Sequence, residues 1–325
     1  MKIIRKKILL VVLILLASNA GSFAFEKVGT TSFQFLKVWP GARATGMAEA
    51  FTSIASNSES VFWNPAGLAR LTGFDFTFGF VDWFMDVNHF SFSAAKNFGE
   101  LGTFGVFGVF SSVGEIEVTR VDRLGFVNGV YNPGLTGEVI NPSSLVLGVS
   151  YARNVTDKFA FGLSVKYVHE NLVFEKAGAL VFDGGLTFNT GFRSIVIGAS
   201  VRHFGQEVKF IDKSYPLPQT FNIGISSYLF SGSDPLIASA GDHSLLVSYD
   251  MIQPRDYDQM HSVGFEYGFK DLIYLRGGYV LNRDQEGFSA GVGIYYKGYR
   301  IDYSFNDYGD YLDSVHRFTI GYEIN

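Results

Sequence analysis

The chain has 325 residues, of which 47% are hydrophobic and 16% aromatic, with 37 glycines, no cysteine and a formal net charge of −5. The acidic balance argues against a nucleic-acid-binding protein, the aromatic content against a disordered chain, and the lack of cysteine against a disulfide-stabilised scaffold. The mean hydropathy of +0.16 is high for a soluble domain, so the first question is whether the chain enters a membrane.

A basic start and a short apolar run mark the N-terminus. Residues 8–17 are apolar throughout, follow four Lys and Arg residues, and precede the small-residue sequence Ser22-Phe23-Ala24. A membrane-spanning helix needs about 20 apolar residues, so this run is too short for one. The pattern predicts a signal peptide over residues 1–24, cut after Ala24, whose loss takes the formal net charge from −5 to −9. The alternative, a buried N-terminal helix, gives the basic flank no purpose.

Residues 25–72 show no alternation and are rich in small side chains. Near the end of this segment Pro65 keeps Asn64 out of the helical region, and the Asn64 side chain can close a turn on the backbone. Gly67 then allows a positive φ. Because the segment is too small to fold alone, we expect it to pack inside the remainder of the chain.

From residue 73 onward the hydrophobic pattern has a period of two, which is typical of β-strands. One face of each segment is bulky and apolar and the other is mainly Gly and Ser; in residues 158–170 the faces are Phe159, Phe161, Leu163, Val165 and Tyr167 against Ala160, Gly162, Ser164 and Lys166. Only helices and closed barrels satisfy every backbone polar group in hydrocarbon. The pattern therefore predicts an all-β, transmembrane antiparallel β-barrel with its bulky face on lipid and its small face around a filled lumen. A soluble β-sandwich is the alternative, since alternation alone does not say which face is wet.

About fourteen such segments can be placed, an even number as single-chain bacterial barrels require. They are residues 73–82, 87–97, 101–112, 144–153, 158–170, 179–189, 192–204, 219–229, 243–251, 260–269, 271–281, 286–296, 298–306 and 315–324. All eight prolines lie outside them, as expected for residues that cannot donate to a ladder. Every second connection is tight except residues 230–242, and several others are long, which fits short periplasmic turns and longer outside loops.

Charged residues also occur on the face assigned to the lumen. An Arg or Lys facing lipid at the membrane midplane would cost about 2–4 kcal/mol, so we expect these groups to pair across the lumen or to line a transport path. The predicted lumen-lining residues are Lys96, Lys166, Asp183, Arg202, Glu266 and Arg276, together with Asp75, Asp250 and Asp302.

No catalytic or metal-binding motif is evident, so we predict no enzymatic activity, no metal and no cofactor. The six histidines are scattered without a His-Glu-x-x-His spacing, and there is no Gly-x-Ser-x-Gly elbow or P-loop. Ser93 and Lys96 have a nucleophile–lysine spacing, but residues three apart on a strand face opposite sides. An acyl hydrolase would need a Ser/His pair on one face of neighbouring strands, and the sequence offers no convincing one. Residues 307–313 lack a regular Ca²⁺-ligand spacing and are interpreted as a solvated acidic loop.

One resemblance to a known family covers almost all of the chain after residue 24. The stretch Phe35-Leu36-Lys37-Val38-Trp39-Pro40-Gly41-Ala42-Arg43-Ala44-Thr45-Gly46-Met47-Ala48-Glu49-Ala50-Phe51, with Trp63-Asn64-Pro65-Ala66-Gly67-Leu68-Ala69, resembles the PorV/PorQ family of outer-membrane proteins. These are relatives of the FadL-type long-chain fatty acid transporters. The resemblance implies a hatch over residues 25–72 and a fourteen-stranded barrel over residues 73–325. Asn64, Pro65 and Ala66 would form the hatch turn, and Gly41, Arg43 and Gly46 would belong to the hatch core, where gating would act.

The resemblance also implies a function in the outer membrane of a Gram-negative-type bacterium. A PorV/PorQ-type barrel would serve protein secretion or surface attachment, with outer-membrane lipid, secreted cargo proteins and components of a type IX-like secretion system as partners, and no nucleic acid. The alternative is a FadL-like channel for long-chain fatty acids or other small hydrophobic molecules. Two features depart from the family: the chain ends Tyr322-Glu323-Ile324-Asn325 without a terminal aromatic residue, and it is shorter than typical fatty acid transporters.

Overall fold

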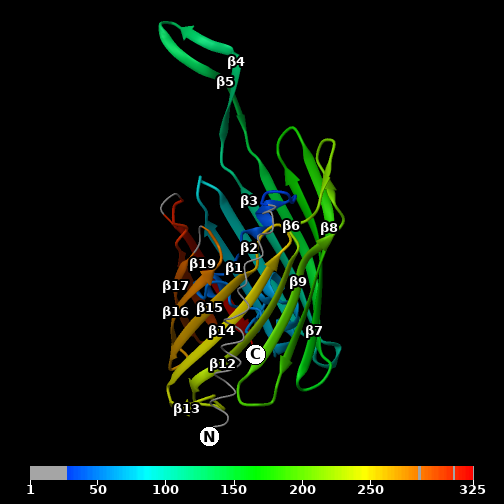
Figure 1. The fold of residues 1–325 in the computed structure, drawn as a ribbon, viewed down its shortest axis with the longest axis vertical. Coiled ribbons are helices and arrows are strands. Elements are labelled where there is room, and N and C mark those ends of the chain that lie inside the picture. The colour runs from blue at the N-terminus through cyan, green and yellow to red at the C-terminus, as the bar shows by residue number, and fades with distance from the viewer. Residues whose placement is uncertain (1–27, 285–286, 310–311, 325) are drawn as a thin grey trace.

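The computed structural model describes residues 28–284, 287–309 and 312–324, and its main feature is a closed antiparallel β-barrel (Figure 1). Fourteen strands form the wall, each hydrogen-bonded to the next, and the pairing of β1 with β19 closes the ring. In order around the wall they are β1 (Phe74–Asp82), β2 (Asn88–Asn97), β3 (Thr103–Ser112), β6 (Ser143–Asn154), β7 (Phe159–Asn171), β8 (Lys176–Asn189), β9 (Val196–Gly205), β12 (Thr220–Ser231), β14 (His243–Pro254), β15 (Met260–Phe269), β16 (Ile273–Leu281), β17 (Phe288–Tyr296), β18 (Tyr299–Asn306) and β19 (Val315–Ile324). Each predicted strand segment overlaps one of these, so the predicted barrel is confirmed.

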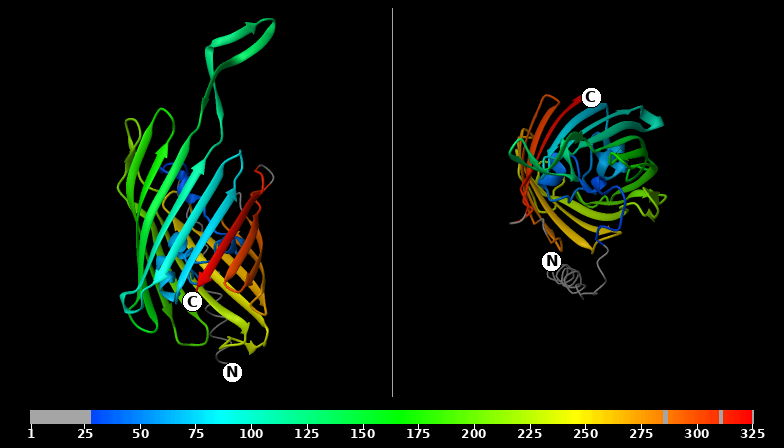
Figure 2. Two further views of the ribbon diagram at one scale, coloured as in Figure 1. Left: turned by 180° about the vertical axis from the view of Figure 1, so that it is seen from behind. Right: turned by 90° about the horizontal axis from the view of Figure 1, so that it is seen from above.

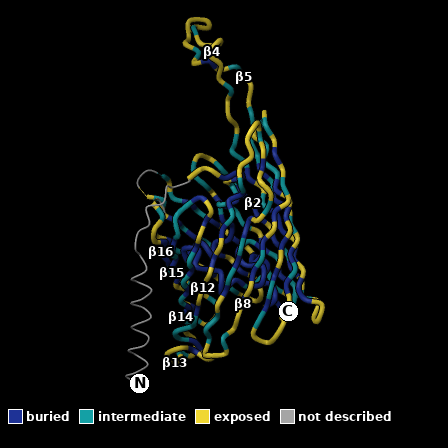
Figure 3. The backbone as a smooth tube through the Cα atoms, turned by 45° about the vertical axis from the view of Figure 1, so that its right-hand side comes forward, coloured by how far each residue is buried: buried dark blue, intermediate teal, exposed yellow. Residues whose placement is uncertain are grey.

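The two faces of the wall differ as the alternation predicts, and Figure 3 shows buried and exposed positions following one another along the strands. On β7, Leu163 exposes 57% of its surface, whereas Ser164 and Lys166 are buried. Large apolar side chains are exposed in the same way on strands all around the wall. A continuous apolar band of this kind is typical of a surface in contact with lipid rather than with water. The β-sandwich alternative is wrong, because the sheet closes on itself instead of stacking on a second sheet.

The helices of the described residues are short, and the wall itself consists of strands. Among the described residues, none is both long enough and apolar enough to cross a bilayer. The predicted signal peptide, residues 1–24, lies outside the described residues.

A hairpin arm is the largest departure from the prediction. Residues 113–142, expected as a loop, contain β4 (Ile116–Val127) and β5 (Val130–Ile140), which pair only with each other and extend well beyond the barrel (Figures 1 and 2). Asn128 and Gly129 both have positive φ, as a two-residue hairpin turn requires. Pro133 lies within β5, and Pro254 ends β14, so the prediction that all prolines avoid strands is wrong for these two. Proline is tolerated in β5 because one edge of that strand has no neighbour.

Residues 230–242 form the one long connection at the end of the barrel where the other connections are tight turns, and they fold back on the wall. Their strand β13 (Ala238–Ser239) pairs in parallel with the end of β12. A second short pair, β10 (Val208–Lys209) with β11 (Ser214–Tyr215), folds the connection between β9 and β12. Both connections are therefore ordered by backbone hydrogen bonds.

Residues 31–72 fill the lumen and are called the plug below. The plug contains the short helices η1 (Gln34–Lys37), α2 (Ala42–Gly46), α3 (Ser60–Trp63) and η2 (Pro65–Arg70); a further helical turn, η3 (Gly99–Leu101), joins β2 to β3. The view along the barrel shows the plug inside the ring of strands (Figure 2). Isolated helices of four to six residues are not stable in water. The plug therefore depends on the wall for its structure.

Glycines of the wall provide the space in which the plug lies. A Cβ on Gly185 would lie 1.9 Å from the Asn64 side-chain oxygen, and one on Gly162 would lie 2.3 Å from the Ala66 nitrogen. Gly264 gives the same space to Met47. The small face of the strands thus holds the plug at backbone contact distance.

We predict that Gly185→Ala destabilises the folded protein while its neighbour Gly184→Ala does not. Gly184 faces outward, and a Cβ there meets nothing closer than 3.7 Å. Overpacking at Gly185 should lower the free energy of unfolding by about 1–3 kcal/mol. Denaturant unfolding, followed by the gel mobility of unheated samples, measures both variants, and equal stability of the two would contradict the proposed fit.

Candidate functional site

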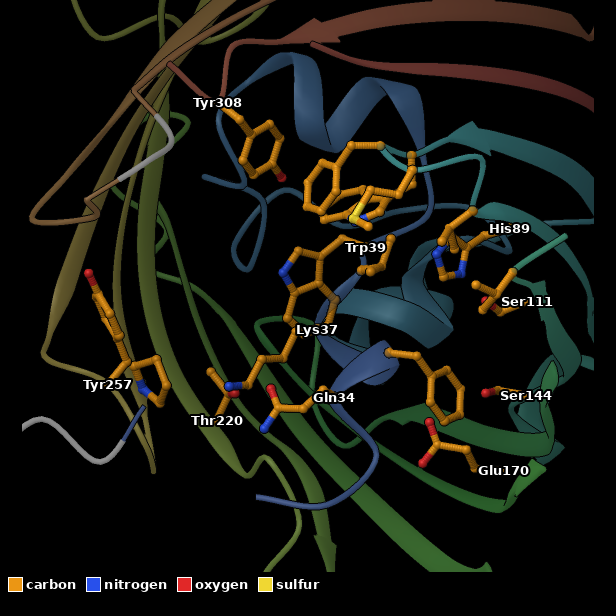
Figure 4. A pocket seen from close by; sticks show the side chains of 18 of the residues that line it. Gln34, Lys37, Trp39, His89, Ser111, Ser144, Glu170, Thr220, Tyr257 and Tyr308 are labelled. Carbon is orange, nitrogen blue, oxygen red and sulfur yellow. The ribbon is translucent and has the colours of Figure 1, made fainter. Parts of the chain in front are cut away.

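A cavity of about 790 Å³ opens at the end of the barrel where the long connections lie, called the long-loop end below (Figure 4). Its floor is formed by the plug residues Phe35, Val38 and Trp39. The surrounding wall and loops add mostly apolar side chains: Trp83, Phe84, Met85, Val87, Val113, Leu172, Ile252, Tyr257, Met260 and Tyr308. The size and lining are those of a site for a small organic molecule. We call it the long-loop cavity.

The basic side chains at this cavity are neutralised by acids. Lys37 Nζ lies 2.6 Å from a carboxylate oxygen of Asp256. The two terminal nitrogens of Arg283 each donate to a carboxylate oxygen of Glu49 at 3.1 Å. Although burial opposes ionisation, hydrogen bonds from Lys37 and Thr31 lower the pKa of Asp256. The cavity therefore offers an anionic ligand no unpaired Lys or Arg.

Four polar side chains face this cavity from neighbouring strands. His89 on β2 lies directly opposite Ser111 on β3, and both line the cavity. Ser144 and Glu170 continue the row on β6 and β7. The strand register thus places a Ser/His pair on one face of neighbouring strands. The pair has no catalytic arrangement, however: neither ring nitrogen of His89 has a hydrogen-bond partner among the described residues, and Glu170 lies at the far end of the row.

Below the cavity, a chain of buried ion pairs joins the plug to the wall. Arg43 of α2 donates two hydrogen bonds to Glu266 on β15, at 2.8 and 2.7 Å. Arg276 on β16 donates to the same carboxylate at 2.6 Å and to Asp302 on β18 at 2.7 Å. The two arginines and two acids balance in charge, so the network can lie inside the lumen.

A second group of charges surrounds Trp39. The Arg202 guanidinium lies over the Trp39 ring at 3.8 Å, and the His203 ring stacks on Trp39 with centroids 5.6 Å apart. His203 has a φ of 60° at a bulge between β8 and β9. The bulge lets both Arg202 and His203 point inward, where Asp183 accepts from the His203 amide at 2.7 Å and from Lys166 at 2.6 Å.

The predicted hatch residues form the structural core of the plug. Asn64 donates to the carbonyls of Thr52 and Leu186, at 2.8 and 3.1 Å, and its oxygen accepts from the Ala66 amide. Pro65 and Ala66 are buried against Gly162. Gly41 has a φ of 99° before α2, and Gly46 lies against Gly291. Arg43 lines a smaller cavity, of about 350 Å³, near the tight turns at the opposite end. None of the six lines the long-loop cavity, and their gating role stays a prediction.

Of the predicted lumen residues, Lys166, Asp183, Arg202, Glu266 and Arg276 are buried inside the barrel, as are Asp75, Asp250 and Asp302. Lys96 is the exception: it is exposed and shares the outward face with Phe92. Its position near the end of β2 lets the ammonium group extend towards the membrane surface, above the Phe98 ring. Asp75, Arg202, Asp250 and Glu266 bind the plug, whereas Lys166 pairs with Asp183 and Arg276 with Asp302 inside the wall.

The described residues contain no group of three or more His, Asp or Glu side chains placed to hold a metal ion. Asp310 of the acidic loop lies outside the described residues. No cofactor site is evident in the geometry of the described parts of the lumen.

We predict that Glu266→Met strongly destabilises the plugged barrel. The substitution leaves two buried arginines with one acid between them, and breaking a buried pair in this way costs about 3–5 kcal/mol. Denaturant unfolding measures the loss. Adding Arg43→Met should restore part of it, whereas Glu138→Met, which removes an exposed pair at 3.8 Å on the arm, should cost about 0–1 kcal/mol.

We predict that ionisation of Glu59 weakens the plug. Burial, and then the charge of Asp302, raise the pKa of Glu59 from 4.5 to about 7. Between these values the folded protein holds a proton that the unfolded chain has lost, so the stability contributed by Glu59 falls as the pH rises from about 4.5 to 7 and is constant above. Unfolding midpoints are measured from pH 5 to 8. In the wild type and in the exposed control Glu100→Gln, the midpoint should fall as the pH rises to 7, and in Glu59→Gln this fall should be absent. An unchanged pH profile in Glu59→Gln would contradict it.

Comparison with known proteins supports the fold. The sequence matches no family model and no curated protein. Similar solved structures include the toluene transporter TbuX of Ralstonia pickettii, with a TM-score of 0.57 and 14% identity over 88% of this chain and 98% of that one. The monoaromatic hydrocarbon channel CymD gives 0.56 and 12%, over 88% and 98%, and a FadL homologue of Pseudomonas aeruginosa gives 0.53 and 11%, over 89% and 99%. This chain therefore shares its overall fold with FadL-type channels.

Proposed function

We propose that this protein is an outer-membrane channel for small hydrophobic molecules, which enter through the long-loop cavity. The observation that carries the proposal is the cavity itself, about 790 Å³ in size, lined mainly by apolar side chains and open above the plug. Its basic groups Lys37 and Arg283 are bound to Asp256 and Glu49, which favours an uncharged ligand over a fatty acid anion. The shared fold with the toluene transporter TbuX and the channel CymD supports the same function.

Passage requires the plug to shift, since the plug fills the lumen between the two cavities. The ion pairs Lys37–Asp256 and Arg43–Glu266 join the plug to the rest of the barrel, so the parts of the plug that move would have to break them. The outward apolar face and the predicted signal peptide, residues 1–24, support a location in the outer membrane with lipid as the surrounding partner.

Protein secretion, the role expected from the PorV/PorQ resemblance, is a second candidate. The comparisons give it no support, because the similar structures are channels for hydrocarbons. One observation favours it: the arm β4–β5 exposes apolar side chains, among them Phe126 and Tyr131 beside its turn, to which a protein could bind. PorV/PorQ membership and contacts with secreted cargo therefore stay predictions.

We predict that cells carrying this protein take up labelled toluene faster than cells without it, and that Val87→Trp returns uptake to the level without it. Val87 lines the cavity, so a tryptophan there occupies its volume. Val106→Trp, on the outward face of β3, is the matched control and should leave uptake unchanged. If toluene uptake does not depend on the protein and its deletion instead leaves exported proteins in the periplasm, the secretion role replaces this proposal.

A further inference from the structure

A row of polar side chains crosses one wall of the long-loop cavity. His89, Ser111, Ser144 and Glu170 lie on the neighbouring strands β2, β3, β6 and β7, and each is the direct cross-strand partner of the next. All four line the cavity, and Figure 4 shows them along one side, with Trp39, Lys37 and Gln34 of the plug on the other. Strands are spaced about 4.8 Å apart, so the row is about 14 Å long. We call it the polar row.

The polar row has unused hydrogen-bonding capacity. His89 exposes only 3% of its surface, and neither of its ring nitrogens has a partner among the described residues. The side chains of Ser111, Ser144 and Glu170 also form no hydrogen bond or ion pair with any described residue. Buried polar atoms without a partner also occur elsewhere in the described lumen, such as Ser200 and Ser262, so it is the position of the row at the cavity that requires an explanation.

The surroundings of the polar row exclude two simple explanations. The row makes no hydrogen bond to the plug among the described residues, whereas the wall charges that hold the plug, such as Glu266 and Asp250, do. It is not part of a generally polar wall either. The next inward-facing row towards the plug on β3, β6 and β7 consists of Val109, Val146 and Val168. On β2 the next row continues with Ser91, so the change from polar to apolar side chains below the level of the cavity holds for β3, β6 and β7.

The geometry points to a hydroxyl-bearing apolar molecule as the ligand of this cavity, an inference that rests on the proposed channel function. A serine hydroxyl donates and accepts, neutral histidine does each at one nitrogen, and a carboxylate only accepts. A hydroxyl group can hydrogen-bond to any of these groups, whereas a plain hydrocarbon leaves the row unpaired and an anion would be repelled by Glu170. The floor of the cavity, with Phe35 and Trp39, would contact the apolar body.

The test compares 2-phenylethanol with ethylbenzene, which differ by one hydroxyl group. Binding is measured on the whole protein in lipid nanodiscs, from the fluorescence of Trp39 and Trp83, which both line the cavity, and is corrected for partition into lipid. We expect the wild type to bind 2-phenylethanol about tenfold more tightly, the size of one or two hydrogen bonds. His89→Phe and the double variant Ser111→Ala/Ser144→Ala should lose that preference and keep the affinity for ethylbenzene.

Ser262→Ala is the matched control, because Ser262 is a buried lumen serine that has no hydrogen-bond partner among the described residues and does not line the cavity. It should keep the wild-type preference, and gel mobility of unheated samples shows that each variant is folded. Equal or tighter binding of ethylbenzene by the wild type, or equal loss of both ligands in the variants, would overturn the inference. In that case toluene uptake would still support the channel. If neither ligand binds and toluene uptake is absent, the channel function itself is wrong.

Discussion

The constraint on which the structure depends is the closure of the sheet between β1 and β19. In hydrocarbon every backbone N–H and C=O must be paired within the protein, so no wall strand can present a free edge. Closure also fixes the two faces of every strand, one towards lipid and one towards a lumen that must be filled. Glycines at the inner face let the plug backbone approach the wall, so the same alternation that makes a lipid-facing surface also makes the site of the plug.

Buried charge gives the plug its position. Glu266 binds Arg43 of the plug and Arg276 of the wall, and Asp250 accepts the backbone amides of Phe51 and Thr52. Buried ion pairs contribute little net stability over a well-packed apolar core, but removing one partner is costly. We infer that these groups specify one arrangement of the plug. The apolar packing around them, such as Phe51 against Trp63, supplies most of the favourable free energy.

The wall strands could be predicted from the sequence, because alternating apolar and small residues are the direct sign of a strand with one face on lipid. The strands of the arm could not be predicted in this way. Its residues 116–140 contain glycines and Pro133 and have no buried face to impose a period. Lys96 lies on the face opposite to the predicted one, because it alternates with the buried Ser93 and its long side chain can carry the charge from the outer face to the membrane surface. The polar row depends on which residues of four strands stand opposite one another. That register is set by turn geometry and plug packing, which the pattern of a single strand does not contain.

The division of the plug into separately held parts limits what the barrel can admit. Helix η1 is tied to the loop after β14 by Lys37 and Asp256, and Phe33 and Leu36 pack against Val168 and Val181 on β7 and β8. Helix α2 lies against β16 to β19, and Arg43 ties it to β15. Release of η1 alone would open a narrow crevice along one arc while α2 still blocks the rest. The space opened in this way would be bounded by the part of the plug that stays in place.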